Sequence, residues 1–424
     1  MSNLTREKLG QAVPLVRAAG LDAWVTFVRE TAEGGDPILP FLLEGGLTWQ
    51  SALIVTQEGK KVAIVGNFDA DPLVASGDWD EVVPYVQGIR DPLVETLDRL
   101  IEKSPTEGSI GAQALAHPVS AGGVERYPRI GVNFSEDNVK ADGLSHGMFS
   151  LLNRYLAGTR FEGCLVSAEP VVSALRARKS PREIEAIRAA IVEGDLIFDW
   201  VDQNVKIGMS EREIFEAIQR IIDAKGLGYG WDRHGNPIVN SGPDSMIGHG
   251  IPSDSVKVSP GHIFHIDLGV IKDGYSSDIQ SCWYVPHPGE TDVPEDVLHA
   301  TEAVVGAISA GAAALRPGVE GWEVDAAARS FLVSKGYPEY MHAFGHQVGR
   351  MAHDGGAVLG PKWERYGRTV TTPIEENEVY TLELGVVVKG RGYLGIEEIA
   401  AVRSSGIEWL SKRQLSMPLL PSVV

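Results

Sequence analysis

The strongest constraint on the fold of this chain is a hairpin pattern with an acidic residue on each arm, and the pattern occurs twice. Each copy reads acidic-Leu-Gly-Val in an apolar run, and the acidic residue is Asp267 in the first copy and Glu383 in the second. A second acid, Asp278 or Glu397, stands on the return arm. Apolar strands rarely carry paired acids without a compensating charge, so the two hairpins should lie side by side around a shared site.

Turn residues separate the two acids of each copy. The midpoint of the first pair falls between Lys272 and Asp273, beside Gly274, and the midpoint of the second pair falls on Gly390. Each pair of carboxylates is therefore expected to lie nearly opposite across a hairpin, with Cβ atoms roughly 5 Å apart on one face. Like charges at that distance repel, and metal ions are the simplest compensation for four such carboxylates.

An internal repeat accompanies the two hairpins. Residues 206–226 align without gaps on residues 316–336, and both segments have the pattern of a loop followed by a helix that ends at Lys-Gly. A Gly-His pair, containing His249 in the first copy and His346 in the second, follows each unit. The repeat predicts two helix-plus-sheet halves related by a pseudo-two-fold axis, with the acids of both halves converging near that axis.

Composition limits the class of protein. A chain of 424 residues with 43% hydrophobic content is long enough for two domains, and a net charge of -19 argues against nucleic-acid binding. The N-terminus lacks the pattern of a signal peptide and no apolar run reaches about 18 residues, so a soluble cytoplasmic protein without membrane association is expected. Cys164 and Cys282 lie in apolar runs and are expected to be buried thiols without a chemical role.

The elements predict a domain boundary between residues 160 and 180. Residues 1–165 read as an α/β domain with strands over 22–29, 51–56 and 60–66, and no catalytic group of residues stands out in it. Residues 166–180 are expected to form a linker. Ser180 and Pro181 are a helix cap and a first helical position, and they open a second domain over residues 181–424.

At this point five residues carry a resemblance. Their order and local context resemble the five metal ligands of the pita-bread metallopeptidases: Asp267, Asp278, His346 in Phe-Gly-His, Glu383 in Thr-Leu-Glu-Leu-Gly and Glu397 in Gly-Ile-Glu-Glu. Within that group the whole chain resembles the Xaa-Pro peptidases, prolidase and aminopeptidase P. The resemblance implies an α/β N-terminal creatinase-like domain followed by an α+β pita-bread catalytic domain. Methionine aminopeptidases usually lack the first domain, and creatinase lacks the metal ligands.

The resemblance also implies roles for these ligands. Asp267 would chelate one of two divalent ions, Asp278 and Glu397 would bridge, and His346 and Glu383 would complete the second ion. Such an oxygen-rich set suits Mn²⁺ first, with Co²⁺ or Zn²⁺ as alternatives. Glu383 would take the proton of the attacking water and pass it to the leaving nitrogen.

Six further residues are candidates for substrate contacts. By resemblance, His249, His342 and His353 would orient substrate and donate to the oxyanion, although a structural role is the alternative for each. Arg365 and Arg368 lie where prolidases carry a group that binds the substrate carboxylate, and Tyr393 is a candidate hydroxyl donor. The alternative for the two arginines is an exposed loop whose charges only offset neighbouring acids.

The chain also departs from the family pattern. Gln347 and Leu384 replace the residues that usually follow the histidine and glutamate ligands, Gln280-Ser281 replaces Thr-Arg, and Gly395 replaces an arginine. The expected activity is hydrolysis of Xaa-Pro dipeptides by a homodimer. The alternatives are an aminopeptidase P acting on longer peptides, another amide or amidino hydrolase, a metal-dependent lyase and a non-catalytic binding module.

Overall fold

The computed structural model describes residues 2–102, 127–248 and 250–420. It divides into two compact units, Met1–Arg176 and Ala177–Val424. The predicted catalytic residue His249 lies outside the described residues. Each unit has its own core, so each is described by itself.

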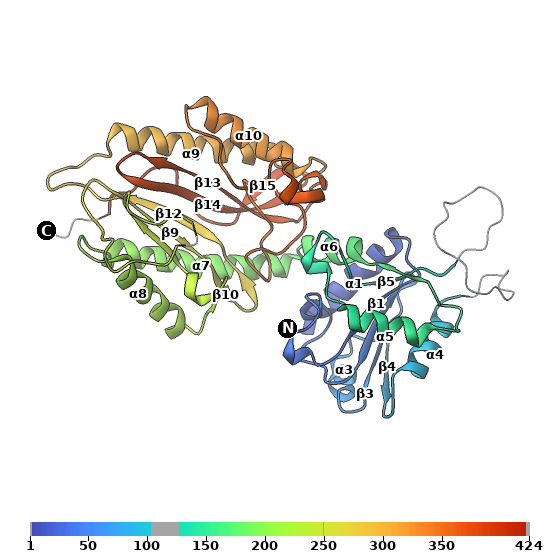
Figure 1. Ribbon diagram of the computed structural model, residues 1–424. Coiled ribbons are helices and arrows are strands. Elements are labelled where there is room, and N and C mark those ends of the chain that lie inside the picture. Colours follow the sequence, from blue (N-terminus) through green and yellow to red (C-terminus); the bar gives the residue numbers. More distant parts are fainter. Residues whose placement is uncertain (1, 103–126, 249, 421–424) are drawn as a thin grey trace. The chain divides into compact units, whose positions relative to one another are not determined.

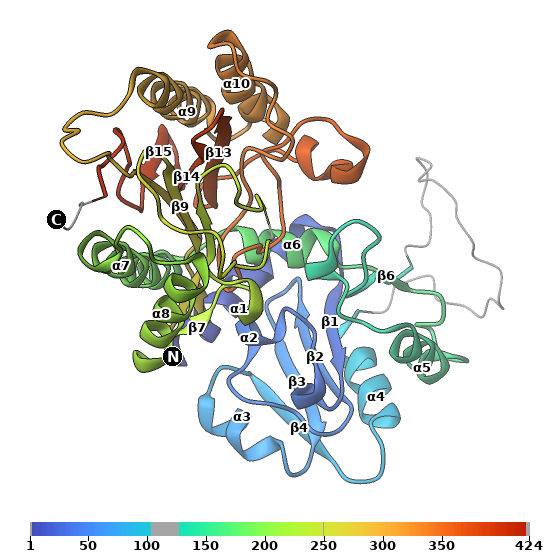
Figure 2. The same cartoon turned by 60° about the vertical axis from the view of Figure 1, so that its left-hand side comes forward.

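The first unit is built on one mixed sheet with the strand order β4-β3-β2-β1-β5-β6. Successive residues of its central strand enter different cores, with Trp24 on one face and Val25 on the other. Helices α4 and α5 cover one face and helices α1, α2, α3 and α6 cover the other (Figure 2). The elements are α1 (Ser2–Ala18), β1 (Ala23–Val28), α2 (Leu39–Leu42), β2 (Ser51–Thr56), β3 (Lys61–Gly66), α3 (Ala70–Ser76), β4 (Glu81–Tyr85), α4 (Arg90–Leu100), β5 (Ile130–Val132), α5 (His146–Leu156), β6 (Leu165–Ser167) and α6 (Glu169–Ala177).

The segment 166–180 differs from the expected linker. Its first residues complete β6, which pairs in parallel with β5. The helix α6 follows and buries Val171, Val172 and Leu175 in the first unit's core. Most of this segment therefore belongs to the first unit, because its apolar residues recur at helical spacing and fill one face of the sheet.

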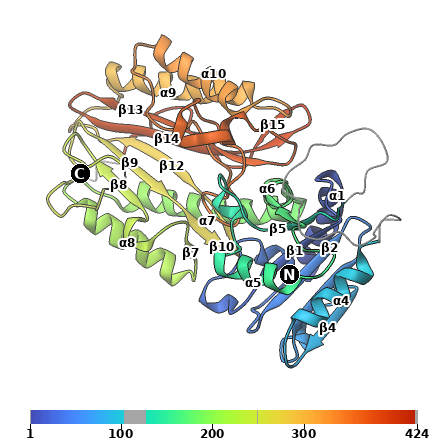
Figure 3. The same ribbon diagram turned by 45° about the vertical axis from the view of Figure 1, so that its right-hand side comes forward.

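The second unit is built on a sheet with the order β13-β14-β12-β9-β8 and a smaller sheet with the order β11-β10-β7. Helices α7 and α8 pack on the half that contains β8, β9 and β12, and α9 and α10 pack on the half that contains β13 and β14 (Figures 1 and 3). The elements are α7 (Pro181–Asn204), α8 (Glu211–Ala224), β7 (Gly228–Tyr229), β8 (Ile238–Ser241), β9 (Ile263–Leu268), β10 (Val270–Lys272), β11 (Tyr275–Ser276), β12 (Ile279–Tyr284), α9 (Glu295–Ala314), α10 (Gly321–Ser334), β13 (Val379–Val388), β14 (Gly392–Arg403) and β15 (Gly406–Trp409), which pairs with β14.

The internal repeat is present as two helices of equal length. Both α8 and α10 have 14 residues, and they begin 110 positions apart, at Glu211 and Gly321. A capping box opens each helix, formed by Ser210 with its partner three residues on in α8 and by Glu320 in α10. The two helices are therefore structural equivalents, as the sequence repeat predicts.

The strand register of the two hairpins tests the prediction that the two acids of each hairpin lie opposite one another. In the second hairpin Glu383 pairs directly with Glu397, as predicted. In the first hairpin Asp267 pairs with Gln280, two residues after Asp278, so the expectation that Asp278 lies opposite Asp267 is wrong. The two-residue turn Asp273-Gly274, with φ of 51° and 78°, sets this register, because Asp-Gly favours the positive φ values of a tight hairpin turn.

Among the described helices, α9 has the length and apolar composition of a membrane-spanning helix, with a mean hydropathy of 1.4. Half of that stretch is buried, and residues such as Val297, Val304 and Ile308 contribute to the core beneath β13 and β14. The same composition therefore serves as a core helix in this unit.

Candidate metal centre

A single row of polar side chains crosses four strands of the second unit. Asp267 on β9 pairs with Gln280 on β12, Gln280 pairs with Glu397 on β14, and Glu397 pairs with Glu383 on β13. Directly opposed residues point to the same face of a sheet. The register alone therefore brings three carboxylates and one amide together.

Asp278 joins this row from outside a strand. It lies between β11 and β12, where the chain leaves one sheet and enters the other. One carboxylate oxygen from each of Asp278, Asp267 and Glu397 lies within 4.8 Å of the others. The break between the strands therefore adds a fourth carboxylate to the row.

His346 reaches the carboxylates from a segment that runs beside β13. Glu383 donates its backbone N–H to the carbonyl of Phe344, and Thr381 donates to the carbonyl of His346 at 2.9 Å. The approach is close, because a Cβ at Gly345 would lie 2.0 Å from the carbonyl oxygen of Thr381. Only glycine fits at that position, and the histidine that follows it is placed against the row.

The imidazole of His346 stands among three carboxylates. Its Nε2 atom lies 3.7 Å from Asp278 Oδ2, 3.6 Å from Glu383 Oε1 and 3.7 Å from Glu397 Oε1. Nδ1 lies 3.5 Å from the backbone carbonyl of Gln347. A proton on Nδ1 would leave the lone pair of Nε2 directed at the acidic cluster, which is the arrangement of a metal-binding histidine.

The loop before His346 is held by α10. Asp325 and Arg329 form an ion pair at 2.8 Å, and the Arg329 guanidinium donates to the carbonyls of Tyr340 and His342. Asp325 also accepts the backbone N–H of Phe344 at 3.3 Å. The repeat helix thus fixes the loop that carries the histidine.

Burial and mutual repulsion dominate the electrostatics of the cluster. Burial raises the pKa of Asp267, with a further contribution from Glu397, and it raises the pKa of Asp278 and Glu383 with contributions from the neighbouring carboxylates. Burial also raises the pKa of Glu397 to about 7. Four carboxyls with raised pKa values in one place favour the binding of a cationic partner.

No side-chain cation of the described residues supplies that partner. No Lys or Arg in that part of the chain forms an ion pair with these four carboxylates. Burial lowers the pKa of His346 to about 3, so its ring is neutral. Asp267 Oδ1 and Glu397 Oε1 are buried without a hydrogen-bond partner. Hard oxygen donors with unused lone pairs and a neutral imidazole fit divalent metal ions.

The donors form two overlapping groups that share Glu397. One contains Asp267, Asp278 and Glu397, and the other contains His346, Glu383 and Glu397, with all donor atoms of each group within 4.8 Å of one another. All five predicted ligands thus belong to two adjacent sets of donors. This arrangement fits a pair of ions better than a single ion.

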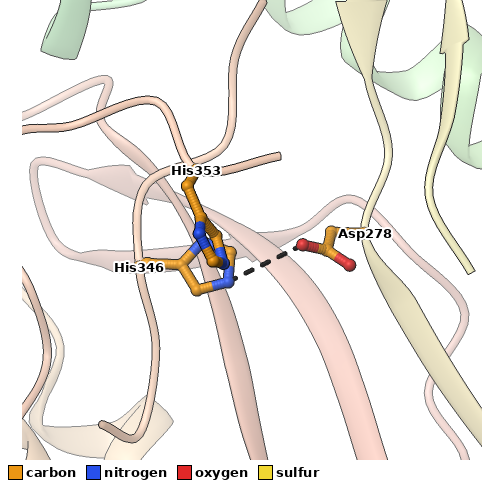
Figure 4. A group of neighbouring side chains, drawn as sticks. All are labelled: Asp278, His346 and His353. Atoms are coloured by element: carbon orange, nitrogen blue, oxygen red, sulfur yellow. Dashed lines mark ion pairs between the residues drawn. The ribbon is translucent and has the colours of Figure 1, made fainter. Parts of the chain in front are cut away.

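The remaining predicted histidines are placed differently. His353 is exposed at the edge of the centre, forms a third group with Asp278 and His346, and has its ring centroid 4.1 Å from that of His346 (Figure 4). His342 is exposed in the preceding loop, 5.6 Å from the ring of Tyr340, and belongs to none of the three donor groups. The structure therefore brings His353, but not His342, to the predicted metal ligands.

The predicted substrate-binding residues lie on two different segments. Arg365 and Arg368 are exposed in a 3-10 segment, Glu364–Thr371. Arg365 donates to the carbonyl of Met341 at 2.6 Å and stacks on Trp363, beside a surface pocket of about 620 Å³. Tyr393 instead packs at the centre, with its ring edge-on to His265 at 5.0 Å.

Two residues of the centre were not among the predicted site residues: His265, and Gln280, which the sequence marked only as a departure from the family pattern. Gln280 donates to Glu397 at 2.8 Å and to Glu383 at 3.2 Å, and its side-chain oxygen lies 3.0 Å from His265 Nε2. The signal that could have found Gln280 is the Asp-Gly turn, which sets it opposite Asp267. His265 stands two residues before Asp267 on the same face.

A family of known proteins matches the part of the chain that carries this centre. The sequence model of metallopeptidase family M24 matches residues 185–404, which is more than half of the chain. The chain belongs to metallopeptidase family M24. Its family membership agrees with the resemblance that the five ligands carry, and the matched region includes all five of these residues.

Relatives of this M24 protein include named dipeptidases. A Xaa-Pro dipeptidase of Pyrococcus furiosus is 28% identical over 250 residues, covering 58% of this chain and 66% of that protein. A Xaa-Pro dipeptidase of Lactobacillus helveticus is 25% identical over 254 residues, covering 59% and 64%. The alignments thus span slightly less than two thirds of the length of these relatives.

Solved structures confirm the predicted two-domain fold. Dipeptidase PepE from Mycobacterium ulcerans matches with a TM-score of 0.70 at 22% identity, covering 99% of both chains. A Xaa-Pro dipeptidase from Bacillus anthracis matches with a TM-score of 0.70 at 20% identity, covering 98% of this chain and all of that one. At these identities the comparison establishes the fold of the M24 protein.

Proposed function

We propose that this protein hydrolyses the Xaa-Pro bond of dipeptides, using two divalent metal ions held by Asp267, Asp278, His346, Glu383 and Glu397. The observation that carries the proposal is the pair of donor groups sharing Glu397, in which buried carboxylate oxygens have no protein partner. The substrate follows from the named Xaa-Pro dipeptidases among the relatives.

The donor set favours Mn²⁺. Carboxylate oxygens and one imidazole suit Mn²⁺ and also accept Co²⁺ or Zn²⁺, whereas neither described cysteine joins the donor groups. When bound, such a pair of ions supplies Lewis acidity at the scissile carbonyl and lowers the pKa of water toward 7. The protein's own contribution is to place the groups that hold and move protons.

Glu383 is the residue that moves the proton. One of its carboxylate oxygens accepts a hydrogen bond from Gln280. The other oxygen lies 3.6 Å from His346 Nε2 and faces the centre. In the absence of metal ions, burial raises the pKa of this carboxyl and the neighbouring carboxylates raise it further. It takes a proton from the attacking water and gives it to the proline nitrogen, which must be protonated before it can leave.

His353 is placed to contact the substrate. Its ring is exposed beside the half-buried His346, at the solvent side of the donor groups. A ring N–H there can donate to the carbonyl oxygen as negative charge develops on it. His342 and Tyr393 are assigned no such contact: His342 lies outside the donor groups, and Tyr393 shares a hydrogen bond with Tyr340.

Recognition of the dipeptide's free carboxylate is assigned to the 3-10 segment. Arg365 already donates to the carbonyl of Met341 and is stacked on Trp363 and Tyr366, so its guanidinium is preorganised at the rim of the surface pocket. Arg368 is exposed in the same segment. A planar guanidinium can hold a carboxylate through two parallel hydrogen bonds. An amide in place of the substrate carboxylate has only one acceptor oxygen and cannot form both.

The test is a substrate panel assayed with Mn²⁺ after removal of bound metal. Xaa-Pro dipeptides should be hydrolysed, and dipeptides without proline should be hydrolysed at least tenfold more slowly. Faster hydrolysis of Xaa-Pro tripeptides than of dipeptides would instead identify an aminopeptidase P.

A matched pair of variants controls for folding. Glu397→Gln should abolish activity. Glu398→Gln is the control that should keep activity, because Glu398 faces the other side of β14 and accepts from Arg413 at 2.8 Å. A protein that binds Mn²⁺ but hydrolyses none of the peptides in the panel would contradict the proposal.

A further inference from the structure

We infer that Gln280 is a positioning residue that orients Glu383 and Glu397 toward the metal centre, and that His265 acts on the centre through Gln280. The inference deepens the proposed function and rests on it for the identity of the ligands. Its geometry stands on contacts around β12 that do not involve any substrate.

The amide of Gln280 holds one oxygen of each glutamate. Nε2 donates to Glu397 Oε2 at 2.8 Å and to Glu383 Oε2 at 3.2 Å. The other oxygen of each carboxylate, Oε1, lies 3.7 Å or 3.6 Å from His346 Nε2, and Glu397 Oε1 has no protein partner. One amide thus fixes the planes of both carboxylates, so that each presents a free oxygen to the centre.

A chain of polar side chains fixes the amide from behind. Gln280 Oε1 lies 3.0 Å from His265 Nε2, and the other ring nitrogen lies 3.0 Å from Asn240 Oδ1. Asn240 is held in turn by its own donations to Ser245 Oγ and the carbonyl of Met246. A neutral imidazole carries one proton, so the ring donates to only one of these two oxygens. With the proton on Nε2, His265 donates to Gln280 Oε1 and selects the amide orientation in which Nε2 of Gln280 faces the carboxylates. A flipped amide would present its oxygen to two carboxylates.

Two glycines leave the room that this arrangement needs. A Cβ at Gly395 would lie 2.7 Å from Gln280 Oε1 and 2.5 Å from Tyr393 Cε1. A Cβ at Gly385 would lie 2.3 Å from the hydroxyl of Tyr393. These glycines are paired across β13 and β14, and the Tyr393 ring occupies the space above them. Side chains there would displace Gln280 or the ring that packs beside it.

The charge of the orienting group matters as much as its shape. A Lys or Arg at this place would form ion pairs with Glu383 and Glu397 and would reduce the negative charge available to a divalent cation. The neutral amide supplies two directed N–H groups and leaves all four carboxylates as anionic ligands. Gln280 therefore combines orientation of the ligands with retention of their charge.

The test measures Mn²⁺ binding to metal-free protein by titration calorimetry. Gln280→Met keeps the length of the side chain and removes both donors, so the dissociation constant for Mn²⁺ should rise roughly 10- to 100-fold, the usual effect of losing a group that orients a ligand. The control is Gln414→Met, because Gln414 makes hydrogen bonds to Ser281 and Cys282 of the same strand without touching a ligand. Its affinity should stay within about threefold of wild type, since no ligand contact changes.

His265 supplies the second arm. His265→Phe should weaken Mn²⁺ binding about tenfold in the wild-type background and should have little further effect in the Gln280→Met background, because both changes act on the same two carboxylates. A purely structural contribution of His265 would give additive effects. In the peptidase assay, Gln280→Met should lower kcat and leave KM within about twofold, because the Gln280 amide contacts Glu383, Glu397 and His265.

The outcomes separate this inference from the proposed function. Wild-type protein that binds no Mn²⁺ would remove the proposed function. Wild-type protein that binds Mn²⁺, together with a Gln280→Met variant of unchanged affinity, would overturn the role of Gln280 alone. Should circular dichroism show Gln280→Met to be unfolded, His265→Phe decides: weakened binding supports the relay, and unchanged binding overturns it.

Discussion

A buried glutamate outside the metal centre should make the stability of this protein depend on pH. Glu378 is 3% exposed and accepts from the hydroxyl of Tyr380 at 2.6 Å and from the backbone N–H of Glu375 at 3.0 Å. Burial raises its pKa from 4.5 to about 7 against the effect of these hydrogen bonds. The difference is equivalent to about 3 kcal/mol of unfolding free energy.

The sign follows from the direction of the shift. The folded-state pKa of Glu378 lies above its unfolded value, so its full contribution to stability is present below about pH 4.5 and is lost as the pH rises through about 7. Glu378→Gln keeps an oxygen acceptor and removes the ionisation. Relative to wild type, the variant should therefore gain about 2 to 3 kcal/mol of stability between pH 5 and pH 8.

The assay is urea unfolding of metal-free protein at both pH values, followed by tryptophan fluorescence. Glu376→Gln is the matched control, because Glu376 is exposed two residues away, and its effect should stay within about 0.5 kcal/mol at both pH values. An equal difference between wild type and Glu378→Gln at pH 5 and pH 8 would refute the assignment of a buried, titrating carboxyl.

Three further predictions concern the proposed activity and assembly. Glu383→Gln should lower kcat by roughly 10² or more, the scale of a lost general acid-base group, and a near-normal rate would exclude its assigned role. Arg365→Ala or Arg368→Ala should cost about 1.5 to 3 kcal/mol in kcat/KM for an Xaa-Pro dipeptide and little for its C-terminal amide. Indifference of both variants to the carboxylate would place its recognition elsewhere. We propose a homodimer, and light scattering that gives a monomer at micromolar concentration would exclude it.

Most of the convergence of the acids could be predicted from the sequence. The opposition of Glu383 and Glu397 could be predicted because the midpoint between them falls on the turn residue Gly390, so spacing and turn agree. The predicted opposition of Asp267 and Asp278 is wrong, because the Asp-Gly turn sits one residue later than the midpoint. A strand register depends on the turn that closes it, and moving the centre of the turn by one residue moves the residue opposite the acid by two.

Tertiary contacts account for what the sequence did not indicate. The placement of the His346 loop depends on two residues of α10. Arg329 donates to the carbonyl of His342, 13 residues later, and Asp325 accepts the N–H of Phe344, 19 residues later. The sequence marks Gln280 only as a departure from the family pattern, and the strand register is what sets it between Asp267 and Glu397. Side-chain contacts of this kind leave no periodic signal in a single sequence.

The central claim is that two metal ions held by the five donors are required for peptide hydrolysis. Metal-free protein should be reconstituted with increasing Mn²⁺, freed of excess ion, and analysed for bound metal by elemental analysis while Xaa-Pro dipeptide hydrolysis is measured on the same samples. We predict that activity rises with occupancy and reaches its maximum near two ions per chain. Full activity in protein that holds well under one ion per chain would contradict the account.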